Sequence, residues 1–354
     1  MRWGRDPMTD LLARTVWMRR VQTALIGAVG TLVFWWLSMP LPFLLGPLAA
    51  CLITALMGAQ LKGVPNHWLN AVRTILGVAA GSSVSPSLLQ HFPQTLASAS
   101  LVPVFLAISL LVGYPFFRRV AGFDRATAYF ATVPGGFAEM ILLGSERGGD
   151  IRALSLVHAT RILTLVSLLP FLISFYVDAD LSAAPGVPVK DIPVKDIVIL
   201  AACAYFGYVG AKRVGLFGAT ILGPMILSAA ASLLGLIENR PPTEALILAQ
   251  FVIGTSVGAH YIGVTRDELR RVVSASVAYA LMLAVLTVLF GELIYLLGIN
   301  DLLHGILAFA PGGQPEMVML AIVTGADITF VIFHHVLRLV LVMSLTPLLS
   351  RWLA

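Results

Sequence analysis

Charged side chains stand inside apolar stretches of this chain at several places. Glu139 and Glu316 each follow a Pro-Gly-Gly sequence, in PGGFAEM and PGGQPEM, and Arg161 and Arg338 each lie within a long apolar run. An ionisable residue at membrane depth is costly and usually marks an ion or substrate pathway. A buried carboxylate can hold a proton or a sodium ion, whereas a guanidinium matches the geometry of a carboxylate or phosphate. These residue types predict a site for an anion and a coupling ion.

The same four residues also have a structural interpretation. Each glutamate lies about one turn into the helix expected after its Pro-Gly-Gly sequence, where a carboxylate caps free amides and favours the positive helix end. Arg161 could pair with Glu139 and Arg338 with Glu316, so that both charges are compensated without a ligand. Both interpretations stay open. We assign the glutamates to ion coupling and the arginines to substrate binding, and expect structural ion pairs that also line the site.

Two histidines and two aspartates recur near these residues. His158 and His335 each precede the arginine by three positions, and residues at that spacing share a helix face. They could relay protons or orient a substrate, or simply pack. Asp150 and Asp327 each precede the next helix and are expected first as N-caps, with cation binding as the second interpretation. We assign the histidines to the substrate site and the aspartates to ion coupling.

The two Pro-Gly-Gly stretches belong to a longer internal repeat. A constant offset of 177 residues separates Pro134 from Pro311 and aligns further Gly, Asp, His and Arg residues without a gap. The chain therefore contains two copies of one unit. Small-xxx-small spacing predicts close helix packing. The glycines with this spacing are Gly77, Gly81, Gly254 and Gly258. The expected organisation is a basic tail at 1–20, a first repeat at 21–176, a linker at 177–196 and a second repeat at 197–350.

The composition places these copies in a membrane. Of the 354 residues, 58% are hydrophobic and 12% are charged, with a mean hydropathy of +0.91. Apolar runs of about 17–25 residues recur, which is the length a helix needs to cross a bilayer. The fold class is an all-α polytopic membrane protein. The net charge of +5 is attributed to cytoplasmic arginines, and no nucleic-acid partner is expected.

The distribution of Lys and Arg favours inverted copies. If each Pro-Gly-Gly segment enters and leaves on the same side, each half crosses the membrane about five times and the second half is upside down. Most Lys and Arg residues then lie on the cytoplasmic side with the N-terminus, leaving Lys190, Lys195 and Arg240 opposite. Parallel halves would divide the positive charges more evenly. The positive-inside rule therefore predicts inverted-topology repeats.

The Pro-Gly-Gly sequences predict broken helices inside the membrane. Residues 125–133 make a helix of about 13 Å, which reaches roughly the middle of the bilayer, and a second half-helix begins near Phe137. Inverted repeats with broken segments are typical of secondary transporters, whose half-helix N-termini suit an anion. The residues assigned to substrate binding by this argument are Pro134, Gly135, Gly136, Pro311, Gly312, Gly313 and Gln314.

The duplicated PGG-x-x-EM sequence resembles the AbrB membrane-protein family, a duplicated bacterial inner-membrane family. The resemblance covers nearly the whole chain beyond the basic tail, and Gln314 and Pro315 depart from the usual small or apolar residues there. It implies a multi-pass, transporter-like protein of the bacterial inner membrane, but it supplies no substrate. Some members carry the label ammonia monooxygenase.

The expected function is secondary active transport of a small anionic or zwitterionic metabolite, coupled to protons or sodium. We expect no enzyme activity, no cofactor beyond the coupling ion and no metal site, because Cys51 and Cys203 are too few to hold one. A membrane-bound metalloenzyme and a non-transporting sensor or assembly factor are the alternatives. The expected partners are the substrate and the lipid bilayer, and a homodimer is left open.

Overall fold

The computed structural model describes residues 7–84, 92–174, 181, 185–216 and 218–349, and the regular secondary structure in these ranges is helical. Five helices in these ranges have the length and composition to cross a membrane: Pro93–Arg119, Ile151–Ser174, Val194–Arg213, Arg266–Leu296 and Ile328–Thr346. Shorter apolar helices accompany them. The predicted all-α membrane protein is confirmed at this level.

The helices of the first half have clear bounds and end before the predicted linker. They are α1 (Pro7–Trp36), α2 (Pro42–Leu56), α3 (Asn66–Gly81), α4 (Phe92–Ala99), α5 (Val102–Arg119), α6 (Arg125–Thr132), α7 (Phe137–Glu146) and α8 (Ile151–Ser174). The break between α6 and α7 falls at the Pro-Gly-Gly sequence, as predicted. Residues 1–6 of the tail and 175–180 and 182–184 around the linker lie outside the described residues.

The helices of the second half follow nearly the same bounds at the offset of 177 residues. They are α9 (Val194–Arg213), α10 (Ala219–Leu233), α11 (Thr243–Ala259), α12 (Arg266–Glu268), a π-helical turn (Leu269–Val273), α13 (Ser274–Leu296), α14 (Leu302–Phe309), α15 (Gln314–Thr324) and α16 (Ile328–Leu349). Both ends of α10 match those of α2, and α14 matches α6. The second Pro-Gly-Gly sequence again separates two short helices.

Two predicted boundaries differ from the structure. The helix α1 begins at Pro7, so residues 7–20 belong to the first helix instead of a separate tail. Arginine is a good helix former, and the basic residues before the apolar run therefore extend the helix without breaking it. The apolar run at 97–117 predicts a single helix, but a turn at Ser100 and Leu101, next to Pro103, separates α4 from α5.

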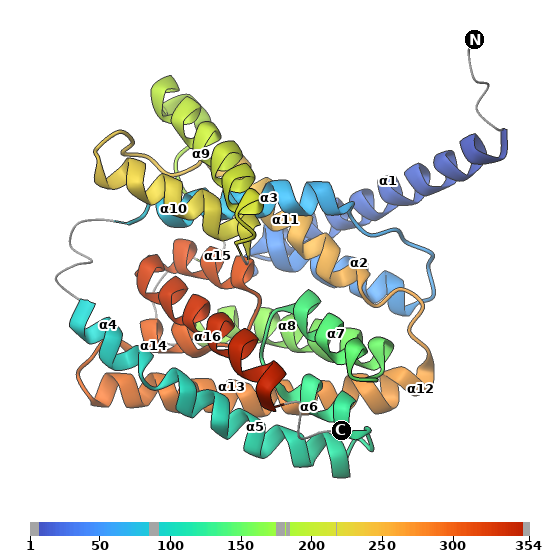
Figure 1. Cartoon of the computed structure of the whole chain (residues 1–354). Helices are drawn as coiled ribbons and strands as arrows, with labels where there is room; N and C mark the ends of the chain where they lie inside the picture. Colours follow the sequence, from blue (N-terminus) through green and yellow to red (C-terminus); the bar gives the residue numbers. More distant parts are fainter. Residues whose placement is uncertain (1–6, 85–91, 175–180, 182–184, 217, 350–354) are drawn as a thin grey trace.

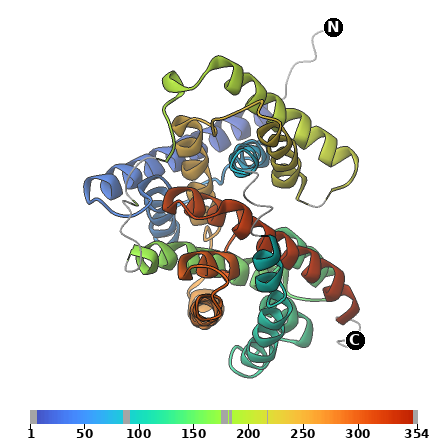
Figure 2. The ribbon, with the colours of Figure 1, turned by 90° about the vertical axis from the view of Figure 1, so that its left-hand side faces the viewer.

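The helices form two layers, each built from both halves (Figures 1 and 2). The first layer contains α1, α2, α3, α9, α10 and α11, and the second layer contains the remaining helices. Within the first layer, α2 packs on α11 and α3 packs on α10. The broken segments α6–α7 and α14–α15 therefore lie together in the second layer, although they are far apart in the sequence.

Glycines allow the close contacts within the first layer. A Cβ at Gly77 would overlap the carbonyl oxygen of Ile221 on α10, and one at Gly254 would overlap that of Leu44 on α2. A Cβ at Gly258 would lie 2.5 Å from the carbonyl oxygen of Leu48. The backbones approach too closely for any larger side chain, as small residues permit in membranes. The predicted packing role of these glycines is confirmed.

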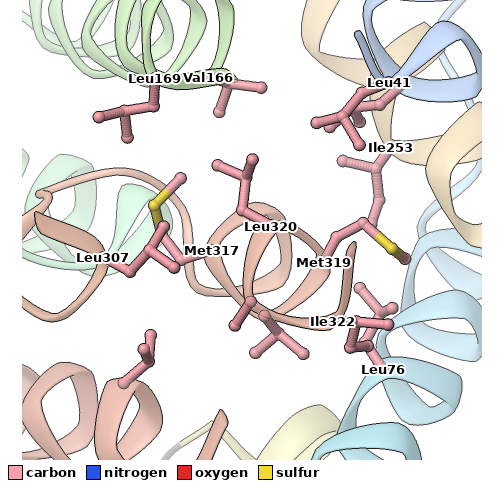
Figure 3. Close-up of a cluster of buried hydrophobic side chains, with 14 of the residues drawn as sticks. Leu41, Leu76, Val166, Leu169, Ile253, Leu307, Met317, Met319, Leu320 and Ile322 are labelled. Atoms are coloured by element: carbon pink, nitrogen blue, oxygen red, sulfur yellow. The ribbon is translucent and has the colours of Figure 1, made fainter. Parts of the chain in front are cut away.

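The hydrophobic core surrounds α15, the helix of the second layer that contacts α3 and α11 of the first layer. Figure 3 shows Leu320 of α15 directed toward Val166 and Leu169 of α8, and Met319 directed toward Ile253 of α11. These side chains are buried. Because α15 is held by apolar contacts with both layers, the position of its N-terminus is fixed.

Candidate functional site

Both Pro-Gly-Gly breaks open onto one cavity of about 210 Å³, hereafter the central cavity. Its lining comes from α3, α7, α8, α15, α16 and the first turn of α10 with its N-cap. Two segments that are 177 residues apart thus build a common site. The predicted site residues that line it are Gly135, Gly136, Glu139, Arg161, Gly312, Gly313, Gln314, Glu316 and Arg338.

The second half-helix of each pair begins at the cavity. Gly136 is the N-cap of α7 and Gly313 that of α15, with nearly equal backbone angles of φ −65°, ψ 143° and φ −72°, ψ 143°. Neither N-cap residue supplies a side-chain hydrogen bond. The first amides of a helix have no partner within it, and they carry the positive end of the helix dipole. Two electropositive helix ends therefore border the same cavity.

The spacing of the PGG-x-x-EM sequence has a steric explanation. A Cβ at Gly135 would lie 2.7 Å from the sulfur of Met140, and one at Gly136 would overlap the Oε2 atom of Glu139. In the second copy, Gly312 and Gly313 make the same contacts with the methionine and glutamate of their own sequence. The first glycine gives room to the methionine, and the second gives room to the carboxylate.

The glutamates fold back over the N-caps of their helices, which the structural interpretation anticipated. The two differ in exposure: Glu316 is 5% exposed and Glu139 is half-buried. The Oε2 atom of Glu316 is buried without a hydrogen-bond partner. Both carboxylates line the central cavity, so capping and ligand contact are compatible in this geometry.

The arginines bind backbone carbonyls, and the predicted pairing with the glutamates is wrong. Arg161 donates from Nη1 to the carbonyl of Val133 at 3.4 Å and from Nη2 to that of Gly135 at 3.1 Å. Arg338 donates from Nη1 to the carbonyl of Ala310 at 2.9 Å. Among the described residues, no ion pair joins either arginine to a glutamate. Val133 and Ala310 are the C-caps of α6 and α14, where the negative helix ends favour a cation.

His335 compensates for the proline of its own copy. Its Nε2 atom donates to the carbonyl of Leu307 at 2.9 Å. In a continuous helix this carbonyl would accept from residue 311, which is Pro311 and has no N–H. His158 lies beside the carbonyl of Phe130, which is orphaned by Pro134 in the same way. The histidines are therefore part of the helix break and do not line the central cavity.

The remaining predicted residues also lie away from the lining. Asp150 accepts at Oδ1 from the amides of Arg152 and Ala153, at 2.9 and 3.0 Å. Asp327 caps α16 in the same way through Thr329 and Phe330. These bonds match the N-cap interpretation and leave the ion-coupling assignment of both aspartates without support. The prolines assigned to substrate binding, Pro134 and Pro311, are buried outside the lining.

Arg73 is a site residue that our sequence interpretation missed. It lies in α3 of the first layer, is half-buried and lines the central cavity. At the offset of 177 residues its counterpart is Gln250, which is buried and unpartnered at both amide atoms. A lone arginine in an apolar helix was the available signal. Its approach to α15 depends on how the layers pack, which the sequence does not state.

A second cavity of about 370 Å³, hereafter the vestibule, adjoins the central cavity. Both are lined by Arg73, Phe137 and Glu316. The vestibule adds polar groups from the start of α3 and the end of α11, including Asn70 and His260. The ring of His260 contacts that of Phe137, with centroids 5.0 Å apart. A solute in the vestibule would lie beside Arg73, Glu316 and the first residues of α7 and α15.

The chain belongs to the AbrB family, because the family model described as "Transition state regulatory protein AbrB" matches residues 9–354. It is 28% identical over 356 residues to the uncharacterized protein YhjN of Bacillus subtilis (strain 168), covering 93% of this chain and 91% of the relative. It is 25% identical over 330 residues to a protein of Escherichia coli (strain K12) described as a proposed regulator, AbrB, covering 89% and 91%. The family description and the second name speak of regulation, and neither names a ligand.

Proposed function

We propose that this protein is a secondary active transporter of a small anionic or zwitterionic metabolite, driven by a proton or sodium gradient. One observation carries the proposal: two half-helix N-termini, two buried arginines and two glutamates line a single cavity at the boundary of the two layers. Broken helices and intramembrane charges of this kind serve substrate and ion binding in transporters. We propose transport and no catalytic reaction.

The lining supports an anionic group on the substrate. Arg161 and Arg338 are 2% and 5% exposed, and each has an Nε atom without a hydrogen-bond partner. The N-terminal amides of α7 and α15 add positive potential at the same place. An anion in the central cavity would accept from these donors and compensate charges that the protein leaves unpaired.

The glutamates support a coupling ion. A buried carboxylate with an unpartnered oxygen, such as Oε2 of Glu316, is stabilised when it binds a proton or a cation. Glu139 provides the second carboxylate of the same lining. Binding of the ion and of the anion would then favour each other, because each compensates the charge that the other brings.

The arrangement of layers supports alternating access. We propose that the two halves are inverted repeats in a bacterial inner membrane, with the N-terminus in the cytoplasm. The first layer is joined by close backbone contacts and would form a scaffold, whereas the second layer carries both broken segments. Accessibility of single cysteines, introduced after replacing Cys51 and Cys203, tests the topology. Labels at Lys62 and Lys212 are expected from the cytoplasmic side, and at Lys190 from the other.

Transport itself is tested in proteoliposomes containing the full chain. Carboxylates, amino acids and sulfonates that raise the melting temperature of the purified protein are offered as labelled solutes, with an imposed proton or sodium gradient. We expect gradient-dependent accumulation that is lost in Arg161→Ala. In Glu316→Gln, we expect the solute still to bind but its accumulation no longer to depend on the gradient.

The matched control is Arg152→Ala, which removes an arginine from the same helix. Arg152 pairs with Glu268 at 2.8 Å and is 46% exposed at its side chain, so its loss costs little. Accumulation that is unchanged in both Arg161→Ala and Glu316→Gln would contradict the proposed roles. Failure of every offered solute to accumulate in the wild type would contradict transport.

A further inference from the structure

The charges around the central cavity do not cancel. Its lining contains three arginines, Arg73, Arg161 and Arg338, and two glutamates, Glu139 and Glu316. With both glutamates ionised, the cavity carries one net positive charge. An uncompensated charge away from bulk water is unfavourable, so the occupied cavity favours contents that restore neutrality.

The cavity also offers two equivalent places for an acidic group. One is formed by the N-terminus of α7 with Arg161, and the other by the N-terminus of α15 with Arg338. The two sets are related by the repeat and face the same space. Each combines a helix N-terminus with a buried guanidinium, which is a favourable setting for a carboxylate or phosphate.

Arg73 is the residue that breaks the equality between the copies. Its counterpart Gln250 is neutral, is absent from the lining and lies in the other half of the first layer. Without Arg73 the lining would contain two arginines and two glutamates and would be neutral. The excess positive charge of the cavity therefore comes from this one side chain.

We infer that the ligand carries two acidic groups, one for each half-helix N-terminus, and that Arg73 sets this preference. The inference rests on the proposed coupling to a cation. A dianion and one cation together neutralise the single positive charge of the lining. A monoanion with the same cation leaves one positive charge, and a zwitterion leaves two. Arg73 also lines the vestibule, where it would attract a dianion more strongly than a monoanion.

The test is calorimetric titration of the purified full chain, in sodium-containing buffer, with three four-carbon probes, butyrate, 4-aminobutyrate and succinate, and the five-carbon dicarboxylate glutarate. We expect at least one dicarboxylate to bind about tenfold or more tightly than both butyrate and 4-aminobutyrate. In Arg73→Gln, which copies the neutral residue of the other half, dicarboxylate affinity is expected to fall about tenfold or more. Butyrate affinity is expected to change less, so that the ratio of dicarboxylate affinity to butyrate affinity becomes smaller.

Two variants make the result specific. Arg73→Lys keeps the charge and is expected to retain the dicarboxylate preference. Lys62→Gln removes an exposed cation just before α3 that lines neither cavity. It is expected to leave the affinity for every probe unchanged. Equal or tighter binding of butyrate or 4-aminobutyrate overturns the inference, as does an equal loss for all probes in Arg73→Gln. Either result leaves the proposed transport intact. Binding of no probe also overturns the inference, and transport is then judged by the proteoliposome assay alone.

Discussion

The two copies of the broken helix share their construction and differ in their surroundings. In both, the second glycine accommodates the glutamate, and an arginine binds the C-cap carbonyl of the preceding half-helix. Yet Glu316 is buried whereas Glu139 is half-buried, and the first helical residue is Gln314 in one copy and Phe137 in the other. What the copies share is needed to break a helix in a membrane, and what they do not share is where ligand preference can arise.

The largest expected effect comes from substituting the arginines of the two copies. Arg161 holds two carbonyls and Arg338 holds one. A buried carbonyl left unsatisfied costs about 1–3 kcal/mol. We expect both alanine variants to lower the melting temperature in detergent, with a larger loss for Arg161→Ala. Equal losses would show that the two guanidiniums stabilise the protein equally despite their different hydrogen bonds. Arg152→Ala serves as the reference variant.

The histidines give the next largest effect and a rescue experiment. His335→Phe removes the donor to the carbonyl of Leu307. We expect the free energy of unfolding to fall by about 1–3 kcal/mol. Adding Pro311→Ala restores a backbone N–H that can reach the same carbonyl, so the double variant is expected to recover part of the melting temperature.

The equivalent histidine substitution in the first copy tests how the two copies differ. Neither ring nitrogen of His158 has a partner at normal hydrogen-bond geometry, so His158→Phe is expected to cost less than His335→Phe. Strictly additive effects of His335→Phe and Pro311→Ala would contradict the proposed compensation.

Local chemistry explains how much could be predicted from the sequence. Pro134 and Pro311 remove a backbone donor wherever the chain folds, so the two breaks and the start of α7 were predictable. The offset of 177 residues then transferred each feature from one copy to the other. The predicted N-cap role of Asp150 was equally local, because it depends on the amides of the next two or three residues.

The rest depended on competition among partners in three dimensions. Arg161 was predicted to pair with Glu139, but carbonyls at the end of α6 lack amide donors and lie within its reach. The glutamate is drawn instead to the helix end beside Gly136. Arg73 was missed because it joins the site only through the packing of α3 against α15, and no residue spacing within α3 encodes that contact.

A smaller effect is expected from the glycines beside the carboxylates. A Cβ at Gly136 or Gly313 would overlap the glutamate Oε2 atom, and the end of a flexible side chain can move aside. Gly136→Ala should therefore keep most of the stability, because Glu139 is half-buried and has room. Gly313→Ala is expected to impair ion dependence more, since Glu316 is enclosed. The check is the sodium and proton dependence of uptake, measured together with the melting temperature. A stronger effect of Gly136→Ala would contradict the expectation that the enclosed Glu316 is the more sensitive carboxylate.

The smallest effect separates capping from ion coupling at Asp150 and Asp327. Asparagine caps a helix about as well as aspartate, whereas alanine costs about 0.5–2 kcal/mol. Asp150→Asn and Asp327→Asn should therefore leave both the melting temperature and the ion dependence of uptake unchanged. Asp150→Ala and Asp327→Ala should lower only the melting temperature. If an asparagine variant lost ion dependence while keeping its stability, the carboxylate charge would be needed in transport, and the site would extend beyond the central cavity to the start of α8 or α16.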